Sequence, residues 1–460
     1  MIIRIASRSI LRNARRSTAT IAAVAVGAVA MLSFSAFKNQ TMIGLQTAIV
    51  ERAGHLTIFR EGYNDFGTAN PAAYDIAGYT ELLGTLRTDP ELSPMINVAT
   101  PVVALGGIAS NFALDTSKTF AGQGILPSDR DKMQRWNEYG LSGGAFQTTG
   151  LRDDDSNRGV VGSGLARMLG FCEALGGQDC PRSAGHSAAT DADKRDFTAL
   201  VGSDRELNRT VSTTPRIDLL ASTAGGAPNI VQMDIGQATK IGAKELDDSF
   251  VRMHIGLAQR LLYGNAEPRA TSIDVQLHHT ADLPAAIDRI KTLNRTGKLG
   301  LEVRDFAELT PSYGQIVGMY TAIFAFISIV IGIVVLFSIV NTMSMTVMER
   351  INEIGTSRAL GFRRSRIGMQ FLAEGVLLGT VGATAGVAIA VALVTTINGL
   401  GLSWMPPGAT VPTPFRLLLA GQEASVFATW LALVLISVVA TVLPAMRAAR
   451  MTTVDSLRHV

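Results

Sequence analysis

The sequence predicts a membrane protein with four transmembrane α-helices, one N-terminal and three C-terminal, and a large α+β extracytoplasmic domain of two lobes. Three runs lack any charged residue over 20, 28 and 22 positions: residues 18–37, 316–343 and 425–446. A fourth apolar run, residues 367–402, holds Glu374 as its single ionisable group. A bilayer core of about 30 Å is crossed by about 20 helical residues, so each run is long enough to span it. Four crossings put residues 38–315 on one side and both termini on the other.

Arginine predicts which side is which. The segments expected on the same side of the membrane as the two termini are residues 1–17, 344–366 and 447–460. All three carry more Arg than Asp and Glu together. The positive-inside rule makes these three segments cytoplasmic and the short loop 403–424 external. Residues 38–315 hold 27 Lys and Arg against 33 Asp and Glu, so the net charge of +3 conceals an acidic outer domain. The basic balance therefore does not indicate a nucleic-acid partner.

The first span, residues 18–37, has two interpretations. An Arg-rich leader before an apolar run is also the pattern of a cleaved signal peptide. The run is longer than the roughly 7–15 residues of a signal core, which favours a retained anchor. Cleavage would leave three spans with the same orientation.

The external segment is long enough for two lobes. Its two ends predict strands and helices of one membrane-proximal α+β lobe, residues 38–119 and 264–315, from period-2 and helical patterns. The strands are expected at 54–59, 96–108, 272–277 and 301–303, and the helices at 76–86 and 281–293. Residues 120–263 form an inserted distal lobe, in which 176–215 is rich in Gly, Ser, Thr, Asp and Ala and is expected to be a mobile loop.

Cys172 and Cys180, the two cysteines of the chain, lie in the distal lobe. A pair in an oxidising compartment indicates a disulfide that closes a small loop. Two free thiols are the alternative. A metal site with His186 falls short of a closed zinc shell.

The third span carries small residues at helical spacing. Gly375, Gly379, Gly382 and Gly386 lie mostly on one side of it and predict a tight helix-packing seam, within the chain or between two copies. Glu374 is an intramembrane acid, for which we expect a structural pairing with Arg363 or Arg366 or a position at the interface; a direct functional role is the alternative. No span has a polar stripe, which argues against a channel for hydrophilic solutes.

The cytoplasmic segment 344–366 predicts a short amphipathic helix. Charges recur at helical intervals around Ile351, Ile354 and Leu360. On pattern alone, such a helix either lies on lipid headgroups or docks a partner.

These residues match a known family. The pattern Glu349-Arg350-x-x-Glu353-Ile354-Gly355-x-x-Arg358-Ala359-x-Gly361, after Asn341 and Met345, resembles the cytoplasmic signature of FtsX/MacB-type ABC transporter permeases. Residues 11–16, 371–374 and 444–458 are similar to other parts of that family. Residues 165–170 and 258–262 are similar to segments of lipoprotein-releasing (Lol-type) permeases. The family's usual proline is missing between Arg450 and Val454, and residues 176–215 look like additional material.

The resemblance implies a role for the amphipathic helix. In this family it contacts a separate cytoplasmic ATPase, so the implied docking surface is Glu349, Arg350, Glu353, Ile354, Gly355, Arg358 and Ala359. An apolar strip with a charged rim suits such a contact. The other implied partners are a second permease copy or homologue in a dimer, membrane lipid, and a periplasmic protein or lipoprotein cargo.

Motifs for nucleotide chemistry and hydrolysis are missing from the sequence. It has no Gly-x-x-x-x-Gly-Lys-Ser/Thr loop, Gly-x-Ser-x-Gly elbow or His-Glu-x-x-His, and Gly162-Ser163-Gly164 lacks the first glycine of an elbow. We therefore expect no enzyme, no catalytic residues and no cofactor or metal on this chain, with ATP and Mg on the partner ATPase.

The combined prediction is a mechanotransmission permease of the bacterial inner membrane, with both termini cytoplasmic. ATP hydrolysis on the partner would move the periplasmic domain, which acts on lipoproteins or other lipid-linked cargo. The alternative is a non-transporting signalling or scaffold protein that activates a periplasmic partner.

Overall fold

The computed structural model describes residues 12, 14–67, 71–140, 148–171, 174–175, 215–241, 244–404, 413–419 and 421–451. It divides the chain into two compact units. The helical unit comprises Met1–Gly44, Ser312–Ser403 and Pro414–Val460, and the α+β unit comprises Leu45–Pro311 and Trp404–Thr413. The predicted fold class, four long apolar helices around a large α+β domain, is confirmed.

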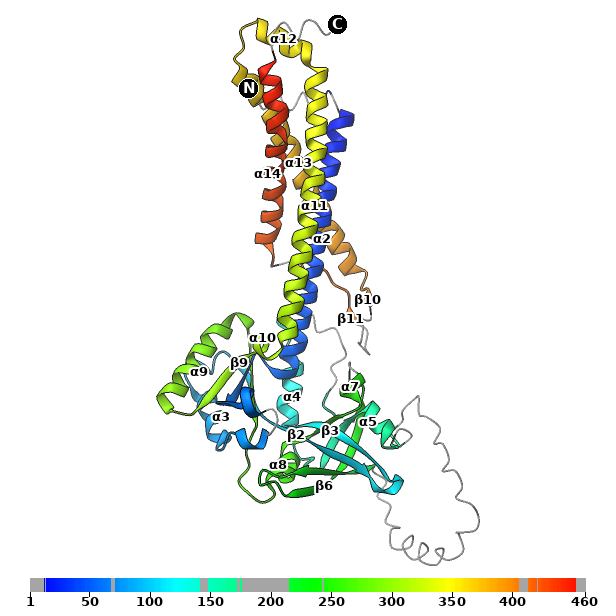
Figure 1. Cartoon of the computed structure of the whole chain (residues 1–460), viewed down its shortest axis with the longest axis vertical. Helices are drawn as coiled ribbons and strands as arrows, with labels where there is room; N and C mark the ends of the chain where they lie inside the picture. Colours follow the sequence, from blue (N-terminus) through cyan, green and yellow to red (C-terminus); the bar gives the residue numbers. More distant parts are fainter. Residues whose placement is uncertain are drawn as a thin grey trace, which may run out of the picture. The chain divides into compact units, whose positions relative to one another are not determined.

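The helical unit is a bundle of long apolar helices (Figure 1), each long and apolar enough to cross a membrane. They are α2 (Ala14–Ala53), α11 (Pro311–Glu349), α13 (Arg364–Gly399) and α14 (Glu423–Arg450). Helices α2, α11 and α14 each contain a predicted span and extend beyond it at both ends, whereas α13 starts before the predicted span 367–402 and ends three residues short of it, at Gly399. Side chains from all four helices form one core that includes Val24, Ile339, Leu378 and Leu433. Outward-facing Phe326, Phe337 and Leu435 are exposed, as expected for helices whose outer surface meets lipid.

The α+β unit is built on a nine-stranded sheet with the order β3-β7-β4-β6-β5-β2-β8-β1-β9. Its strands are β1 (Leu56–Arg60), β2 (Ile96–Asn111), β3 (Thr116–Ile125), β4 (Arg158–Gly162), β5 (Arg216–Ser222), β6 (Pro228–Thr239), β7 (Phe250–His254), β8 (Ser272–Leu277) and β9 (Leu301–Asp305). The helices are α3 (Tyr79–Thr88), α4 (Pro127–Gln134), α5 (Ser163–Met168), α7 (Lys244–Asp247), α8 (Ile255–Tyr263), α9 (Leu283–Gly297) and α10 (Phe306–Leu309). Short elements are η1 (Tyr63–Gly67), η2 (Pro71–Tyr74), η3 (Phe112–Leu114), η4 (Thr280–Asp282), β10 (Ser403–Trp404) and β11 (Thr413–Pro414).

The first lobe is a four-stranded antiparallel sheet covered by α3 and α9. Strand β1 pairs with β8 and β9, and β8 pairs with the first half of β2. Alternate residues point to one side, where Leu56 and Ile58 meet Leu86 of α3 and Ile290 of α9 in a single core. Its strands and helices come from the two ends of the segment between α2 and α11.

The second lobe is a ring of strands. Besides its neighbours in the long sheet, β3 pairs with β2, which closes the circuit β2-β3-β7-β4-β6-β5-β2. The core on its inner side includes Phe120, Leu219, Met233 and, from α8, Leu261. Closing the ring removes the free strand edges that would otherwise invite pairing with other chains.

Strand β2 belongs to both lobes, which changes the expected boundary at residue 120. Its first half, to Val102, pairs with β8, and from Val103 onward it pairs with β3. The chain therefore changes lobe inside a strand. The apolar run around residues 96–108 gives no local signal of that change, because both halves are equally suited to a strand.

Helix α4 fastens the two lobes together. Arg130 of α4 is buried and forms an ion pair with Asp274 of β8, with 3.1 Å between Nη2 and Oδ2. The Gln276 amide donates to the Met133 carbonyl at 2.9 Å, and the Trp136 indole donates to the His278 carbonyl at 3.1 Å. These bonds satisfy polar groups buried between α4 and β8.

Candidate functional site

The candidate site is the short helix α12 (Ile351–Ala359) and the turns on either side of it. Helix α11 ends at Glu349, and Arg350 leaves helical geometry with φ of −104° and ψ of 18°. After α12, Gly361 adopts a φ of +87°, which glycine reaches without strain. The chain then enters α13 at Arg364. This break, short helix and glycine turn produce the amphipathic helix predicted within residues 344–366.

One side of α12 packs into the helical unit. Ile354 and Gly355 are buried, and Ile354 shares the bundle core with Ile367 and Phe371 of α13. The inner face of α12 is therefore apolar and already covered by the chain's own helices.

A buried ion pair ties the beginning of α12 to α13. The Arg350 Nη1 and Glu374 Oε1 atoms are 2.9 Å apart, and the two side chains are only 6% and 3% exposed. A buried charge is strongly unfavourable without a partner, so each side chain makes the burial of the other possible. Arg350 is thus the partner of Glu374, in place of the expected Arg363 or Arg366.

The opposite side of α12 is charged and exposed. Glu353 Oε1 lies 2.6 Å from Nη2 of Arg12, and Glu349 forms an ion pair with Arg16 of α2. Arg358 donates to the Phe362 carbonyl at 3.2 Å, and Ala359 is exposed. Four of the seven residues implied as a docking surface thus lie at least partly in the open: Glu349, Glu353, Arg358 and Ala359.

The other three implied docking residues lie inside the chain. Arg350, Ile354 and Gly355 face the bundle, where they hold α12 in place. The sequence pattern identifies α12 but gives no sign of which of its faces meets the bundle. The pairing of Arg12 with Glu353 and of Arg16 with Glu349 was also not foreseen, since residues more than 300 positions apart leave no local pattern.

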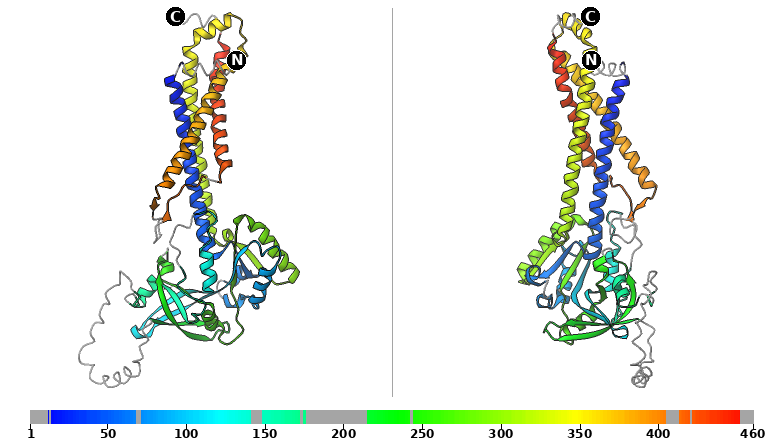
Figure 2. Two further views of the ribbon diagram at one scale, coloured as in Figure 1. Left: turned by 180° about the vertical axis from the view of Figure 1, so that it is seen from behind. Right: turned by 45° about the vertical axis from the view of Figure 1, so that its right-hand side comes forward.

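The four glycines of α13 lie at close helix contacts within the chain. A Cβ atom on Gly375 would come within 1.9 Å of Thr441 Oγ1, and one on Gly379 within 2.3 Å of Ser437 Oγ, both on α14. Towards the other end of α13, Gly382 and Gly386 meet α2, where added Cβ atoms would lie 2.7 Å from Val24 Cβ and 2.5 Å from Ala28 Cβ. The small residues therefore place α13 against two neighbours. Figure 2 shows α13 and these neighbours from two further directions.

Other predicted features fall outside the described residues. These are the cysteine pair Cys172 and Cys180 and nearly all of the loop 176–215.

Comparison with known proteins matches residues 320–453 to the FtsX-like permease C-terminal family. The chain is 28% identical over 229 residues to the macrolide export ATP-binding/permease protein MacB of Bdellovibrio bacteriovorus, which covers 47% of this chain and 32% of that protein. It is 31% identical over 196 residues to MacB of Escherichia coli, covering 42% and 28%. It is 30% identical over 171 residues to the pyoverdine export ATP-binding/permease protein PvdT of Pseudomonas putida, covering 36% and 26%.

The matched segments thus span between about a quarter and a third of the length of these relatives. Among solved structures, the periplasmic region of MacB from Actinobacillus actinomycetemcomitans is similar, with a TM-score of 0.30, 13% identity, and coverage of 57% of this chain and 94% of that one.

Proposed function

We propose that this chain, whose residues 320–453 are an FtsX-like permease C-terminal segment, works as the permease part of a MacB-type ABC exporter. A separate cytoplasmic ATPase would bind α12, and nucleotide-driven movement of the ATPase would pass through α12 to the helical unit and on to the α+β unit. The observation that carries this proposal is the double attachment of α12, by the Arg350–Glu374 pair and by Ile354. A short helix that is fixed at these two points passes a movement of the ATPase on to the helical unit, because it does not shift independently of α13.

The proposed contact for the ATPase is the exposed side of α12 together with the last residue of α11. It comprises Glu349, Glu353, Arg358 and Ala359, with both signs of charge around a small residue. Exposed ion pairs such as Arg12–Glu353 contribute about 0–1 kcal/mol, so a partner can replace them at small cost. Arg350, Ile354 and Gly355 support this surface from beneath.

The proposed setting is the inner membrane of a bacterium, with the basic segments cytoplasmic and the α+β unit periplasmic. The arginine distribution supports this orientation. A second permease copy or homologue would complete a dimer, because one chain with four spans offers one α12 to one ATPase.

For the cargo we retain lipoproteins or other lipid-linked periplasmic molecules, on the resemblance of residues 165–170 and 258–262 to Lol-type permeases. Export of a small molecule is the second candidate. The matched relatives are named for export of macrolides and of pyoverdine, which favours this candidate and favours transport over signalling.

The test is co-purification of the detergent-solubilised chain from its bacterial host, with mass-spectrometric identification of what is bound. We expect a P-loop ATPase with the wild type and its loss with Glu349→Lys/Glu353→Lys. The absence of any ATPase with the wild type would overturn the proposal in favour of a signalling or scaffold role.

The matched control is Arg12→Glu/Arg16→Glu. It breaks the same two ion pairs by changing their basic partners and leaves Glu349 and Glu353 unchanged. If this control retains the ATPase while Glu349→Lys/Glu353→Lys loses it, the ATPase contacts Glu349 and Glu353 themselves. Equal loss of the ATPase from the two variants would instead show that the ATPase does not bind Glu349 and Glu353 directly.

A further inference from the structure

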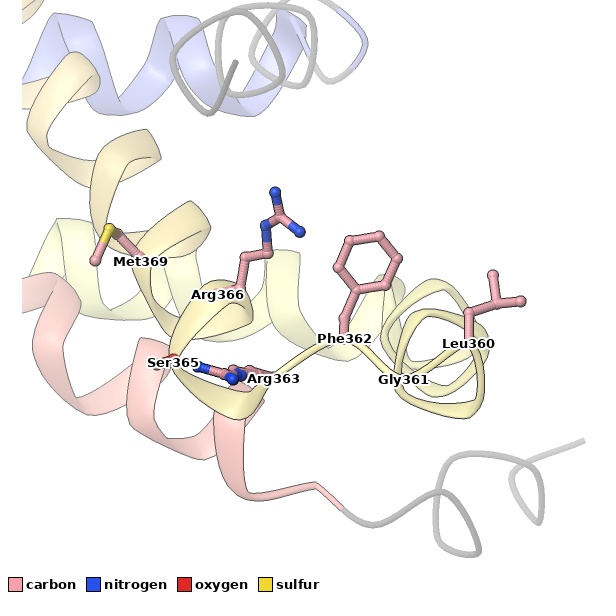
Figure 3. A pocket seen from close by; sticks show the side chains of 7 residues that line it. All are labelled: Leu360, Gly361, Phe362, Arg363, Ser365, Arg366 and Met369. Carbon is pink, nitrogen blue, oxygen red and sulfur yellow. The ribbon is translucent and has the colours of Figure 1, made fainter.

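A cavity of about 520 Å³ lies beside α12, at the turn that leads into α13. It is lined by Leu360, Gly361, Phe362, Arg363, Ser365, Arg366 and Met369 (Figure 3). These residues belong to the helical unit, and α13 is one of the helices that can cross a membrane. The cavity therefore lies at the end of a span, where an aqueous region and the bilayer meet.

The polar part of the cavity is positively charged. Arg363 and Arg366 line it, Arg364 lies between them in the chain, and none of the lining residues that the structure describes is acidic. None of these three arginines forms an ion pair within the described part of the chain, although Arg12, Arg16 and Arg350 nearby each do. The Arg366 guanidinium lies 5.3 Å from the centre of the Phe362 ring, and Figure 3 shows both side chains projecting to the same side. This stacking holds Arg366 in place while its N–H donors remain available.

The rest of the cavity wall is apolar and open. Leu360 is 80% exposed, Met369 55% and Phe362 40%. Large apolar side chains grouped beside unpaired arginines call for a ligand with an anionic head and an apolar body.

We propose that this cavity binds an anionic phospholipid of the adjacent leaflet. Its phosphate accepts hydrogen bonds from Arg363 and Arg366, and the upper part of its acyl chains covers Met369 and Leu360. The charge of the cavity selects a lipid with net negative charge over a zwitterionic one. The bound lipid would then rest against the turn that joins α12 to α13. This site is separate from the exposed acids of α12 and does not depend on the ATPase contact proposed above.

The experiment is native mass spectrometry of the full chain in detergent, titrated with phosphatidylglycerol or with phosphatidylcholine. We expect tighter binding of phosphatidylglycerol. Arg363→Gln/Arg366→Gln should weaken that binding by roughly 30-fold, the effect of two basic residues beside an anionic lipid. The charge-conserving Arg363→Lys/Arg366→Lys should retain most of the affinity.

The matched control is Arg447→Gln/Arg450→Gln, which removes the same charge from the exposed C-terminal end of α14, outside the cavity. It should leave the phosphatidylglycerol affinity within about twofold of the wild type. Inorganic phosphate in excess should not displace the lipid, because phosphate lacks the apolar part that the cavity covers; displacement would identify a simple anion site instead.

Three further results would overturn the proposal. The first is equal affinity for phosphatidylglycerol and phosphatidylcholine. The second is an equal loss of phosphatidylglycerol affinity in Arg363→Gln/Arg366→Gln and in Arg447→Gln/Arg450→Gln. The third is unchanged lipid binding by Arg363→Gln/Arg366→Gln combined with loss of the ATPase. The last result would assign the cavity to the protein partner. Because lipid binding and ATPase recovery are measured separately, failure here is distinguishable from failure of the proposed function.

Discussion

At the scale of single residues, Arg350 and Glu374 most need an explanation, because both are charged side chains buried in the helix bundle. Sequence spacing identified Glu374 as unusual but suggested the wrong partner. Arg363 and Arg366 precede Glu374 by 11 and 8 positions, and α13 runs from Arg364. At 1.5 Å per residue they lie about 16 Å and 12 Å away along the axis, too far for a direct contact. Arg350 reaches Glu374 because the chain folds back at α12, which a linear pattern does not reveal.

This pair yields a stability prediction. Glu374→Gln removes the carboxylate that pairs with the buried Arg350 and should lower the free energy of unfolding by about 3–5 kcal/mol. Arg350→Met/Glu374→Met removes both charges and should restore most of that loss. Denaturant titration in detergent micelles measures each variant.

The exposed pair provides the control for this prediction. Arg12→Gln breaks the Arg12–Glu353 contact, whose side chains are 59% and 56% exposed, and should change the free energy of unfolding by about 0–1 kcal/mol. An equally small effect from Glu374→Gln would contradict the buried pairing.

At the scale of elements, the sequence predicted what local periodicity determines. The spans, the strands β1, β2, β8 and β9, and the helices α3 and α9 all overlap the ranges that the patterns indicated, with ends that differ by a few residues. Closure of the strand ring was not predicted, because the pairing of β2 with β3 and β5 joins residues far apart in the sequence. For the same reason, the sequence predicted the helix α12 but not which of its sides is exposed, because that orientation depends on contacts with the bundle core.

The glycines of α13 give an element-scale prediction. A methyl group on Gly379 would lie 2.4 Å from Ser437 Cβ, a short side chain that cannot move aside, whereas Gly318 in α11 has open space around it. Both substitutions to Ala improve helix propensity by about 1 kcal/mol. We expect Gly318→Ala to be neutral or stabilising, and Gly379→Ala to lower the free energy of unfolding by about 1–3 kcal/mol through overpacking.

Thermal unfolding of the two Ala variants in one detergent measures this difference in sign. Gly379→Ala with a melting temperature equal to or above that of Gly318→Ala would show that α13 and α14 are not in close contact.

At the scale of the whole molecule, the α+β unit contains a pH-sensitive group at its centre. His55 is fully buried, its Nδ1 accepts a hydrogen bond from the Leu277 N–H at 3.0 Å, and its ring lies 5.0 Å from that of Trp136. Burial lowers the pKa of His55 to about 4, and the neighbouring Glu138 partly opposes this by raising it. Protonation of Nδ1 would also break the bond to Leu277.

The direction of the pH effect follows from this lowered pKa. Below pH 6.5 the unfolded chain protonates His55 while the folded unit does not, so the free energy of unfolding falls as the pH drops from about 6.5 towards 4. The full loss is about 3 kcal/mol. Urea unfolding followed by Trp fluorescence across this range should show it in the full chain.

His55→Gln isolates the histidine in this measurement. Asp75 and Asp274, whose pKa values burial raises, stabilise the folded unit as the pH falls and act in the opposite direction in both proteins. Between pH 7 and pH 4, the free energy of unfolding should therefore fall by about 3 kcal/mol less in His55→Gln than in the wild type. Identical pH profiles for the two proteins would place the His55 pKa near its ordinary value.

The contact between Arg12 and α12 has a consequence for how the protein is synthesised. Arg12 and Glu353 are 341 positions apart, so a ribosome completes almost the whole α+β unit before α12 emerges. Until α11 is synthesised, α2 must be held in the bilayer by its own apolar length. Glu374 is in the opposite situation, since Arg350 is synthesised only 24 residues before it. The bundle is therefore assembled after most of the α+β unit has been synthesised, when α11 and then α13 and α14 follow α2.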